Sequence, residues 1–194
     1  MIPNTINDLP AMGCLSAVQK CIRRGLELDA MRFAVELHQT SKNFGTMVCN
    51  RLEIISHEDI DTIAAPWIVP YVKAACDQAR GWYDPNKLGR SLMPIGNCIR
   101  LMARAPKSRQ GDHFQVATRL AAELEGYVPE IPDWADDQHT LRGKQLGRGL
   151  DYFRQESTKL EPPPLGLDPY EEDAYRLWNL KRGLGAKDAS RNDG

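Results

Sequence analysis

The sequence predicts an all-α fold, an antiparallel array of about six to eight amphipathic helices followed by an irregular proline- and glycine-rich C-terminal third. Two observations predict it. Apolar residues recur at helical spacing through most of the chain, whereas runs of β-branched residues in strict alternation are almost absent. At 194 residues, of which 42% are hydrophobic and 26% charged, the chain can bury one sizeable core.

The first three helices are expected between residues 15 and 56. The first ends at Gly25, because glycine adopts the positive φ that commonly terminates a helix. Asp29 is a suitable N-cap for the second, and the third is expected from about residue 46. Their apolar faces consist of Leu15, Val18 and Ile22, then Ala30, Phe33, Ala34 and Leu37, and then Val48, Leu52 and Ile55.

Three further helices are expected before Gly126. Pro66 suits the first turn of the fourth, Pro106 ends the fifth, and the sixth runs from about Gly111 to Gly126. Their apolar residues are Ile68, Tyr71, Val72 and Ala75, then Leu92, Ile95, Ile99 and Met102, and then Phe114, Ala117, Leu120 and Leu124.

The composition changes after Gly126. An acidic stretch over 123–137 is followed by a glycine-rich basic stretch over 142–149, and three prolines at 162–164 require an extended backbone. Asp168 and Pro169 form an N-cap and N1 pair for a final helix. The residues expected to face inward from it are Tyr170, Ala174, Leu177 and Trp178.

The sequence therefore divides into three parts. A helical domain is expected over 1–160, a proline-led linker with a final packing helix over 161–184, and a disordered polar tail over 185–194.

The five cysteines are scattered, odd in number and free of any C-x-x-C pair, which argues against a disulfide framework or a structural zinc site. We expect reduced thiols that act as small apolar core residues. Residues 1–10 carry no basic residue and no long apolar run, and no stretch reaches the ~18 apolar residues of a membrane span. A cytoplasmic protein without membrane contact or cofactor is expected.

Residues 56–61, Ser-His-Glu-Asp-Ile-Asp, concentrate ionisable groups at a helix end. One histidine and three carboxylates could offer mixed nitrogen and oxygen ligands, so a metal or acid–base site around His57, Glu58, Asp59 and Asp61 is one interpretation. The cluster lacks the H-E-x-x-H spacing of a zinc site. The simpler interpretation is structural, with charged side chains bonding to backbone groups or to bases of neighbouring helices.

Two segments, residues 100–119 and 142–154, carry more basic than acidic residues in a chain whose net charge is only −1. Bases on exposed turns can contact phosphates, or they can pair with the acidic stretch over 123–137. The candidate phosphate contacts are Arg104, Lys107, Arg109, Arg142, Lys144 and Arg148.

Known catalytic patterns do not support an enzyme. The segment G-K-Q-L-G-R-G over 143–149 lacks the G-x-x-x-x-G-K-[ST] order of a phosphate-binding loop, and no strand precedes it. A G-x-S-x-G elbow is also absent from the sequence.

Three segments, in order, are similar to one known family. They are 29–37 (D-A-M-R-F-A-V-E-L), 50–60 (N-R-L-E-I-I-S-H-E-D-I) and 101–108 (L-M-A-R-A-P-K-S). They resemble D-x-A-x-Y-W-L-A-R-M-L, R-R-L-x-x-x-A-S-E-D-I-G and Y-L-A-L-A-P-K-S in the C-terminal helical region of the RarA/MgsA family, replication-associated AAA+ ATPases related to the Werner-helicase-interacting protein. Residues 144–152 are a weaker match to K-x-L-G-Y-G-x-G-Y-x-Y. The motif residues carried over are Arg51, Glu58, Asp59, Pro106, Lys107 and Ser108.

The resemblance spans roughly residues 15–155 and implies an all-helical domain that forms a homotetramer in DNA replication or repair. His57 is an extra residue within the E-D motif, and the glycine after Ile60 is missing. The sequence has no Walker A or Walker B motif, so the family's ATP hydrolysis is not carried over, and the ATPase could be a separate partner.

The leading hypothesis is a non-catalytic oligomerisation and adaptor module that contacts DNA or a replication protein. The alternatives are a small metal-dependent enzyme centred on residues 57–61, and a dedicated protein-binding partner with no role at DNA.

Overall fold

A computed structural model describes residues 4–189 of the chain, with side chains described up to Gly183. Helices account for 66% of the chain, and within the described range the backbone forms no strand, only an isolated bridge between Ile60 and Lys107. The predicted all-α class is confirmed. The structure divides into two compact units, Met1–Val128 and Pro129–Gly194.

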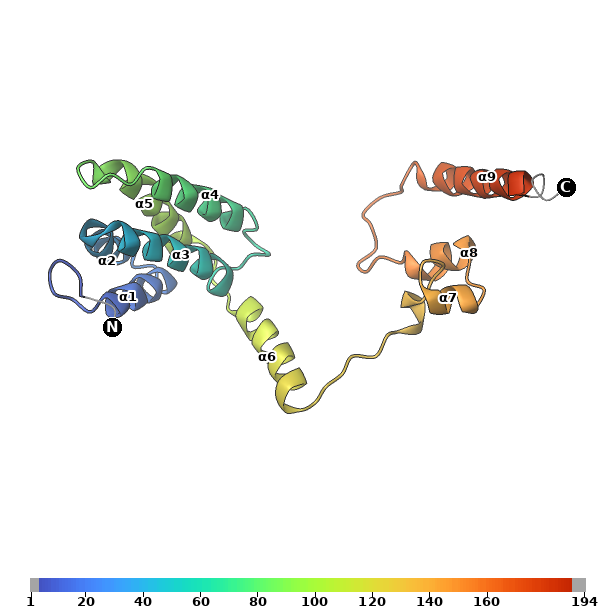
Figure 1. The fold of residues 1–194 in the computed structure, drawn as a ribbon, viewed down its shortest axis with the longest axis horizontal. Helices are drawn as coiled ribbons and strands as arrows, with labels where there is room; N and C mark the ends of the chain where they lie inside the picture. The colour runs from blue at the N-terminus through green and yellow to red at the C-terminus, as the bar shows by residue number, and fades with distance from the viewer. Residues whose placement is uncertain (1–3, 190–194) are drawn as a thin grey trace. The chain divides into compact units, whose positions relative to one another are not determined.

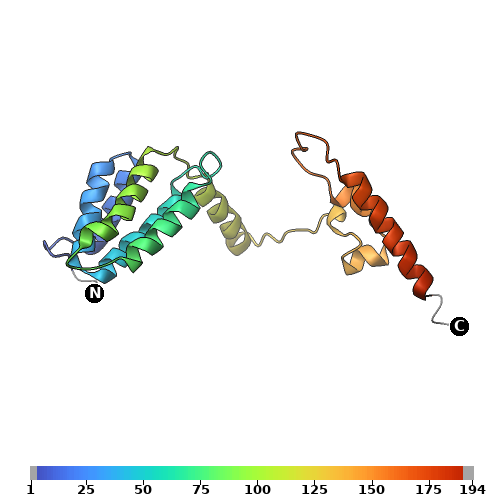
Figure 2. The same cartoon turned by 90° about the horizontal axis from the view of Figure 1, so that it is seen from above.

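The first unit contains six helices, drawn in Figures 1 and 2 from blue to yellow. Consecutive helices among the first five pack on one another, and α2 also packs on α5. The six are α1 (Ala11–Arg23), α2 (Glu27–Thr40), α3 (Lys42–Glu58), α4 (Ile68–Gly81), α5 (Leu88–Arg104) and α6 (Gln110–Leu124).

The core lies within the bundle of α1–α5 and consists mainly of the apolar stripes that the helical spacing predicts. One residue expected on these stripes, Tyr71, is instead 40% exposed, so its assignment to the core is wrong. Ile22, Leu52 and Ile95 are among the largest fully buried side chains of the core. Such a core, buried on all sides, supplies most of the free energy that holds the five helices together.

Helix ends follow local chemistry. Gly25 has φ +76 and ends α1 as predicted. The second helix begins at Glu27 rather than at Asp29, which lies in its first turn. The third begins at Lys42, earlier than predicted, because the Ser41 hydroxyl accepts a hydrogen bond from the Phe44 amide at 3.2 Å and caps it.

Helix α6 forms where the sequence predicts it, but none of its residues is buried. Phe114 and Leu124 of its apolar stripe are 75% and 77% exposed, whereas Leu120 is half-buried. In both views α6 extends away from the bundle formed by α1–α5 (Figures 1 and 2).

The second unit begins at Pro129, whereas the sequence places a boundary after residue 160. Side-chain contacts explain the difference, because Arg148 bonds to Asp133 and joins the acidic stretch to the basic stretch in one unit. Its elements are η1 (Asp133–Ala135), α7 (Leu141–Gln145), α8 (Leu150–Tyr152), η2 (Phe153–Ser157) and α9 (Glu171–Ala189).

The final helix, α9, differs from the prediction in two ways. The residues expected to face inward are largely exposed, at 77% for Tyr170, 54% for Leu177 and 47% for Trp178. The helix also continues to Ala189, into the segment expected to be a disordered tail, of which residues 190–194 lie outside the described range.

Over the described residues, no helix has both the length and the apolar character needed to cross a membrane.

Candidate functional site

Two motifs that lie about 50 residues apart in the sequence, E-D-I and A-P-K-S, meet in the first unit. Ile60 pairs with Lys107 in the isolated bridge. The Asp61 amide donates to the Pro106 carbonyl at 3.0 Å, and the Ser108 amide donates to the Asp59 carbonyl at 3.2 Å. The backbone therefore ties the end of α3 to the turn that links α5 and α6. We call this place, formed by residues 58–61 and 106–109, the motif junction.

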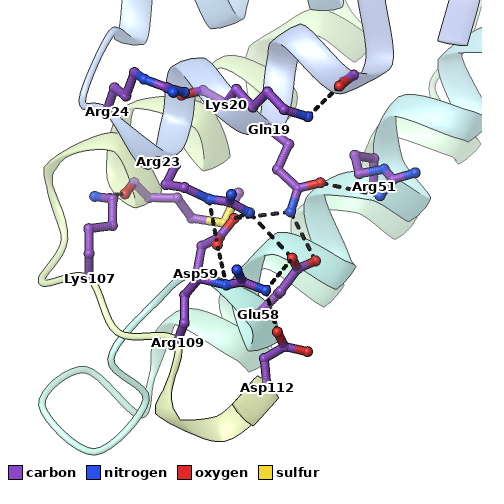
Figure 3. A network of polar contacts seen from close by, with 12 residues as sticks. Gln19, Lys20, Arg23, Arg24, Arg51, Glu58, Asp59, Lys107, Arg109 and Asp112 are labelled. Carbon is purple, nitrogen blue, oxygen red and sulfur yellow. Dashed lines mark hydrogen bonds and ion pairs between the residues drawn. The ribbon is translucent and has the colours of Figure 1, made fainter. Parts of the chain in front are cut away.

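Asp59 is the centre of the motif junction, and its side chain is fully buried. Arg23, in the last turn of α1, donates to its carboxylate from Nε at 2.8 Å and from Nη2 at 3.1 Å. Gln19 donates from Nε2 at 3.1 Å (Figure 3). A buried carboxylate is stable only when charged partners and hydrogen bonds replace the water it has lost, and here α1 supplies both.

Glu58 extends this network toward α6. Its carboxylate accepts from Gln19 at 2.9 Å, from Arg23 at 3.3 Å and from Arg109 at 3.4 Å. Arg109 also pairs with Asp112, in the first turn of α6 (Figure 3). Through Arg109, the first turn of α6 is therefore attached to the two acidic residues at the end of α3.

Arg51 belongs to the same network from the side of α3. Its Nη1 donates to the side-chain amide oxygen Oε1 of Gln19 at 3.3 Å. Its Nε is buried with no hydrogen-bond partner among the described residues. Arg51 therefore orients Gln19, whose side-chain amide nitrogen donates hydrogen bonds to Glu58 and Asp59.

Lys107 ends α5. Its ammonium donates to three backbone carbonyls, those of Met102 at 2.7 Å, Ala103 at 2.9 Å and Ala105 at 2.8 Å. A cation on the last carbonyls of a helix satisfies orphan acceptors and interacts favourably with the helix dipole. Partial burial lowers the pKa of Lys107, and the nearby Asp59 carboxylate opposes that shift. This ammonium is committed to the backbone, so it is a poor candidate for a phosphate contact.

The arrangement of the side chains does not favour a metal site at residues 57–61. His57 is exposed, while Glu58 and Asp59 face arginines from α1 and from the start of α6. Among the residues that the structure describes, no group of three histidine, cysteine or acidic side chains could hold a metal ion. The physical reason is that guanidinium groups already neutralise the two carboxylates.

The other candidate bases are mostly paired within the protein. Arg104 makes two hydrogen bonds to the Glu27 carboxylate, at 2.8 and 2.7 Å. Hydrogen bonding to Arg104 lowers the pKa of the Glu27 carboxyl group. Arg142 lies 3.3 Å from Asp136. Lys144 is exposed. Arg104, Lys107 and Arg109 belong to the first unit, and the other three belong to the second.

Arg148 shows why the basic stretch is structural. Its guanidinium makes two bonds to the Asp133 carboxylate, at 2.7 and 2.6 Å, and lies 4.2 Å from the centre of the Tyr152 ring. One face of the Tyr152 ring is thus covered by an arginine of its own unit.

The sequence reveals the acidic half of the motif junction but not its partners. Gln19 and Arg23 precede Asp59 by 40 and 36 residues, and neither stands in a recognisable pattern. The only signal is that Arg23 falls in the last turn of a helix, where bases are common for other reasons. The carboxylates and guanidiniums of the motif junction neutralise each other. Their bonds hold α1, the end of α3 and the start of α6 together.

Comparison with known proteins gives one similarity. No protein-family model matches the chain. The chain is similar to Replication-associated recombination protein A of Bacillus subtilis (strain 168), with 28% identity over 138 residues. The match covers 71% of this chain and 31% of that protein, so the chain spans less than a third of its relative. This similarity supports a distant relation to the family that the motifs indicate.

Proposed function

We propose that this chain is a non-catalytic helical module that assembles with copies of itself and acts as an adaptor in DNA replication or recombination. The similarity to a replication-associated recombination protein supports the biological context. The observation that carries the assembly is the wholly unburied apolar face of α6.

A helix of 15 residues without a buried side chain lacks the main source of helix stability in proteins. Isolated helices of about 12–15 residues are marginal in water, and most gain their stability by packing an amphipathic face. The α6 face presents Phe114, and Leu124, Tyr127 and Val128 continue the exposed apolar surface at and beyond its end, the last two at 61% and 78% exposure. Several large apolar side chains exposed on one helix and the segment after it are typical of an interface.

The motif junction fixes the position of the helix that carries this apolar surface. Arg109 bonds to Glu58 on one side and to Asp112 of α6 on the other. The first turn of α6 is therefore held against the end of α3, and its apolar stripe is presented in a defined direction. A second copy presenting the same stripe would cover it, and closed symmetric assembly with four copies is the form we expect.

We also propose the adaptor role, and the similarity to part of a replication-associated recombination protein supports it. We expect the assembled module to act with a separately encoded ATPase or another replication protein. We also propose DNA contact through the exposed basic turns, where most of the bases already have acidic or backbone partners.

The test places a charge in the apolar stripe of the proposed interface. Sedimentation velocity compares the wild-type chain with Phe114→Glu, and Gln115→Glu serves as the matched control because it adds the same charge at the neighbouring exposed position. We expect a concentration-dependent oligomer for the wild type and the control, and a monomer for Phe114→Glu. Equal sedimentation of all three would defeat the proposal.

A further inference from the structure

The outer face of α4 and α5 carries a shallow groove that the proposed assembly does not use. The two helices lie side by side in both views (Figures 1 and 2). Two hollows of about 370 Å³ and about 270 Å³ adjoin there, and both are lined by Tyr71 and Asn97. We call the two hollows together the α4–α5 groove.

Three aromatic side chains line the α4–α5 groove along α4. Trp67 is 54% exposed, Tyr71 is 40% exposed and Trp82 is 36% exposed. From Trp67 to Trp82 the helical rise amounts to about 22 Å, so the aromatic rings are distributed along the whole groove. Exposed rings in a row are platforms on which the flat faces of nucleobases can stack.

The charge of the α4–α5 groove has one sign. Arg100 and Arg104 line its first hollow, and the Arg90 guanidinium lies 5.0 Å from the centre of the Trp82 ring. No carboxylate lines either hollow within the described part of the chain. The one acid of α4, Asp77, is instead paired with Lys73 at 2.8 Å and Arg80 at 2.9 Å.

The groove also contains amide side chains, Gln78 in the second hollow and Asn97 in both. Amides can donate to and accept from base edges. A groove that combines aromatic rings, arginines and amides, without carboxylates, suits a ligand with flat apolar faces, polar edges and negative charge.

We propose that the α4–α5 groove binds single-stranded DNA, with bases stacked on Trp67 and Tyr71 and phosphates held by Arg100 and Arg104. The Trp82 ring already lies against the Arg90 guanidinium. A duplex is unsuitable because its base faces are already stacked. The choice of DNA over RNA rests on the proposed function. Arg104 would share its guanidinium between Glu27 and the strand, so Arg100 carries more of the phosphate contact.

The test measures binding of a fluorescently labelled 15-nucleotide oligothymidine to the full chain by anisotropy. Trp67→Ala and Arg100→Ala are the groove variants. Trp178→Ala, in the second unit, is the matched control for loss of an exposed tryptophan, and Arg32→Ala is the control for loss of an exposed arginine. Circular dichroism establishes that each variant is folded, and Trp67→Leu serves if Trp67→Ala is not.

We expect Trp67→Ala to weaken binding about tenfold, which corresponds to the loss of one stacked base, and both controls to bind as the wild type does. Contact with two phosphates predicts that the logarithm of the affinity falls with the logarithm of the salt concentration at a slope of about −1.4. Comparison with an oligouridine of the same length tests the choice of DNA, for which weaker binding of the RNA is expected.

Absence of binding at low salt, affinity independent of salt, or equal affinity of the groove variants and the wild type would overturn the proposal. Groove variants that change the molar mass of the protein but not its affinity for oligothymidine would show that the groove binds protein instead. Tighter binding of oligouridine would overturn the choice of DNA. The oligomeric state, measured separately, distinguishes these failures from failure of the proposed assembly.

Discussion

Asp59 offers the sharpest test of the motif junction, through the substitution Asp59→Asn. The replacement keeps the shape of the side chain but removes its charge and converts one acceptor oxygen into a donor. That donor would face donors of Arg23 or Gln19, which now bond to Asp59 at 2.8–3.1 Å. The perturbation is therefore electrostatic, with little change in packing.

The expected cost follows from the burial of each partner. The Asp59 side chain is fully buried, so its charge depends on its protein partners, whereas Arg23 is 32% exposed and can be partly rehydrated after the substitution. Hydrogen bonds to charged groups contribute about 1.5–3 kcal/mol each, and breaking a buried ion pair costs about 3–5 kcal/mol. With the exposure of Arg23 taken into account, we expect the free energy of unfolding to fall by about 3 kcal/mol.

Urea denaturation followed by circular dichroism at the helical signal measures this change. Asp29→Asn is the control, because Asp29 pairs with Arg32 on the surface at 2.9 Å and its loss should cost less than about 0.5 kcal/mol. If Asp59→Asn and Asp29→Asn unfold at the same urea concentration, the reasoning about the motif junction is refuted.

Two further predictions concern single buried or capping groups. Lys107→Ala removes the cation from the last carbonyls of α5. The free energy of unfolding should fall by about 1–2 kcal/mol in the same urea assay. An unchanged free energy of unfolding would contradict the capping role. Burial lowers the pKa of His38, so the unfolded chain takes up a proton that the folded chain does not, and stability is full above the ordinary histidine pKa of about 6.5 and decreases below it. Between pH 7.5 and 5.5 the urea midpoint of the wild type should therefore decrease more than that of His38→Gln, and parallel decreases would contradict this assignment.

The sequence predicts the helices of the first unit well, because their signals are local. Apolar spacing identifies the stripes that become the core, and Gly25 and Pro106 mark helix ends through backbone constraints that act within a few residues. The beginning of α3 is missed because a serine cap at Ser41 outweighs the apolar pattern that starts later.

Long-range and surface features are not predictable in this way. Nothing near Arg23 in the sequence indicates a bond to Asp59, since the two meet only when α1 packs beside α3. The stripe on α6 has the same pattern as a buried stripe, because amphipathic spacing identifies an apolar face but does not show what packs against it. Charge alone identifies the six bases as candidate phosphate contacts, and only the fold shows that Arg104 and Arg148 have partners.

The central claim is that copies of this chain assemble, and light scattering on the purified wild-type protein over a dilution series tests it most directly. We predict a molar mass four times that of the single chain at micromolar concentration, decreasing toward the monomer on dilution. A monomer mass at every concentration would contradict the account, because the apolar face of α6 would then remain exposed to water with nothing to cover it.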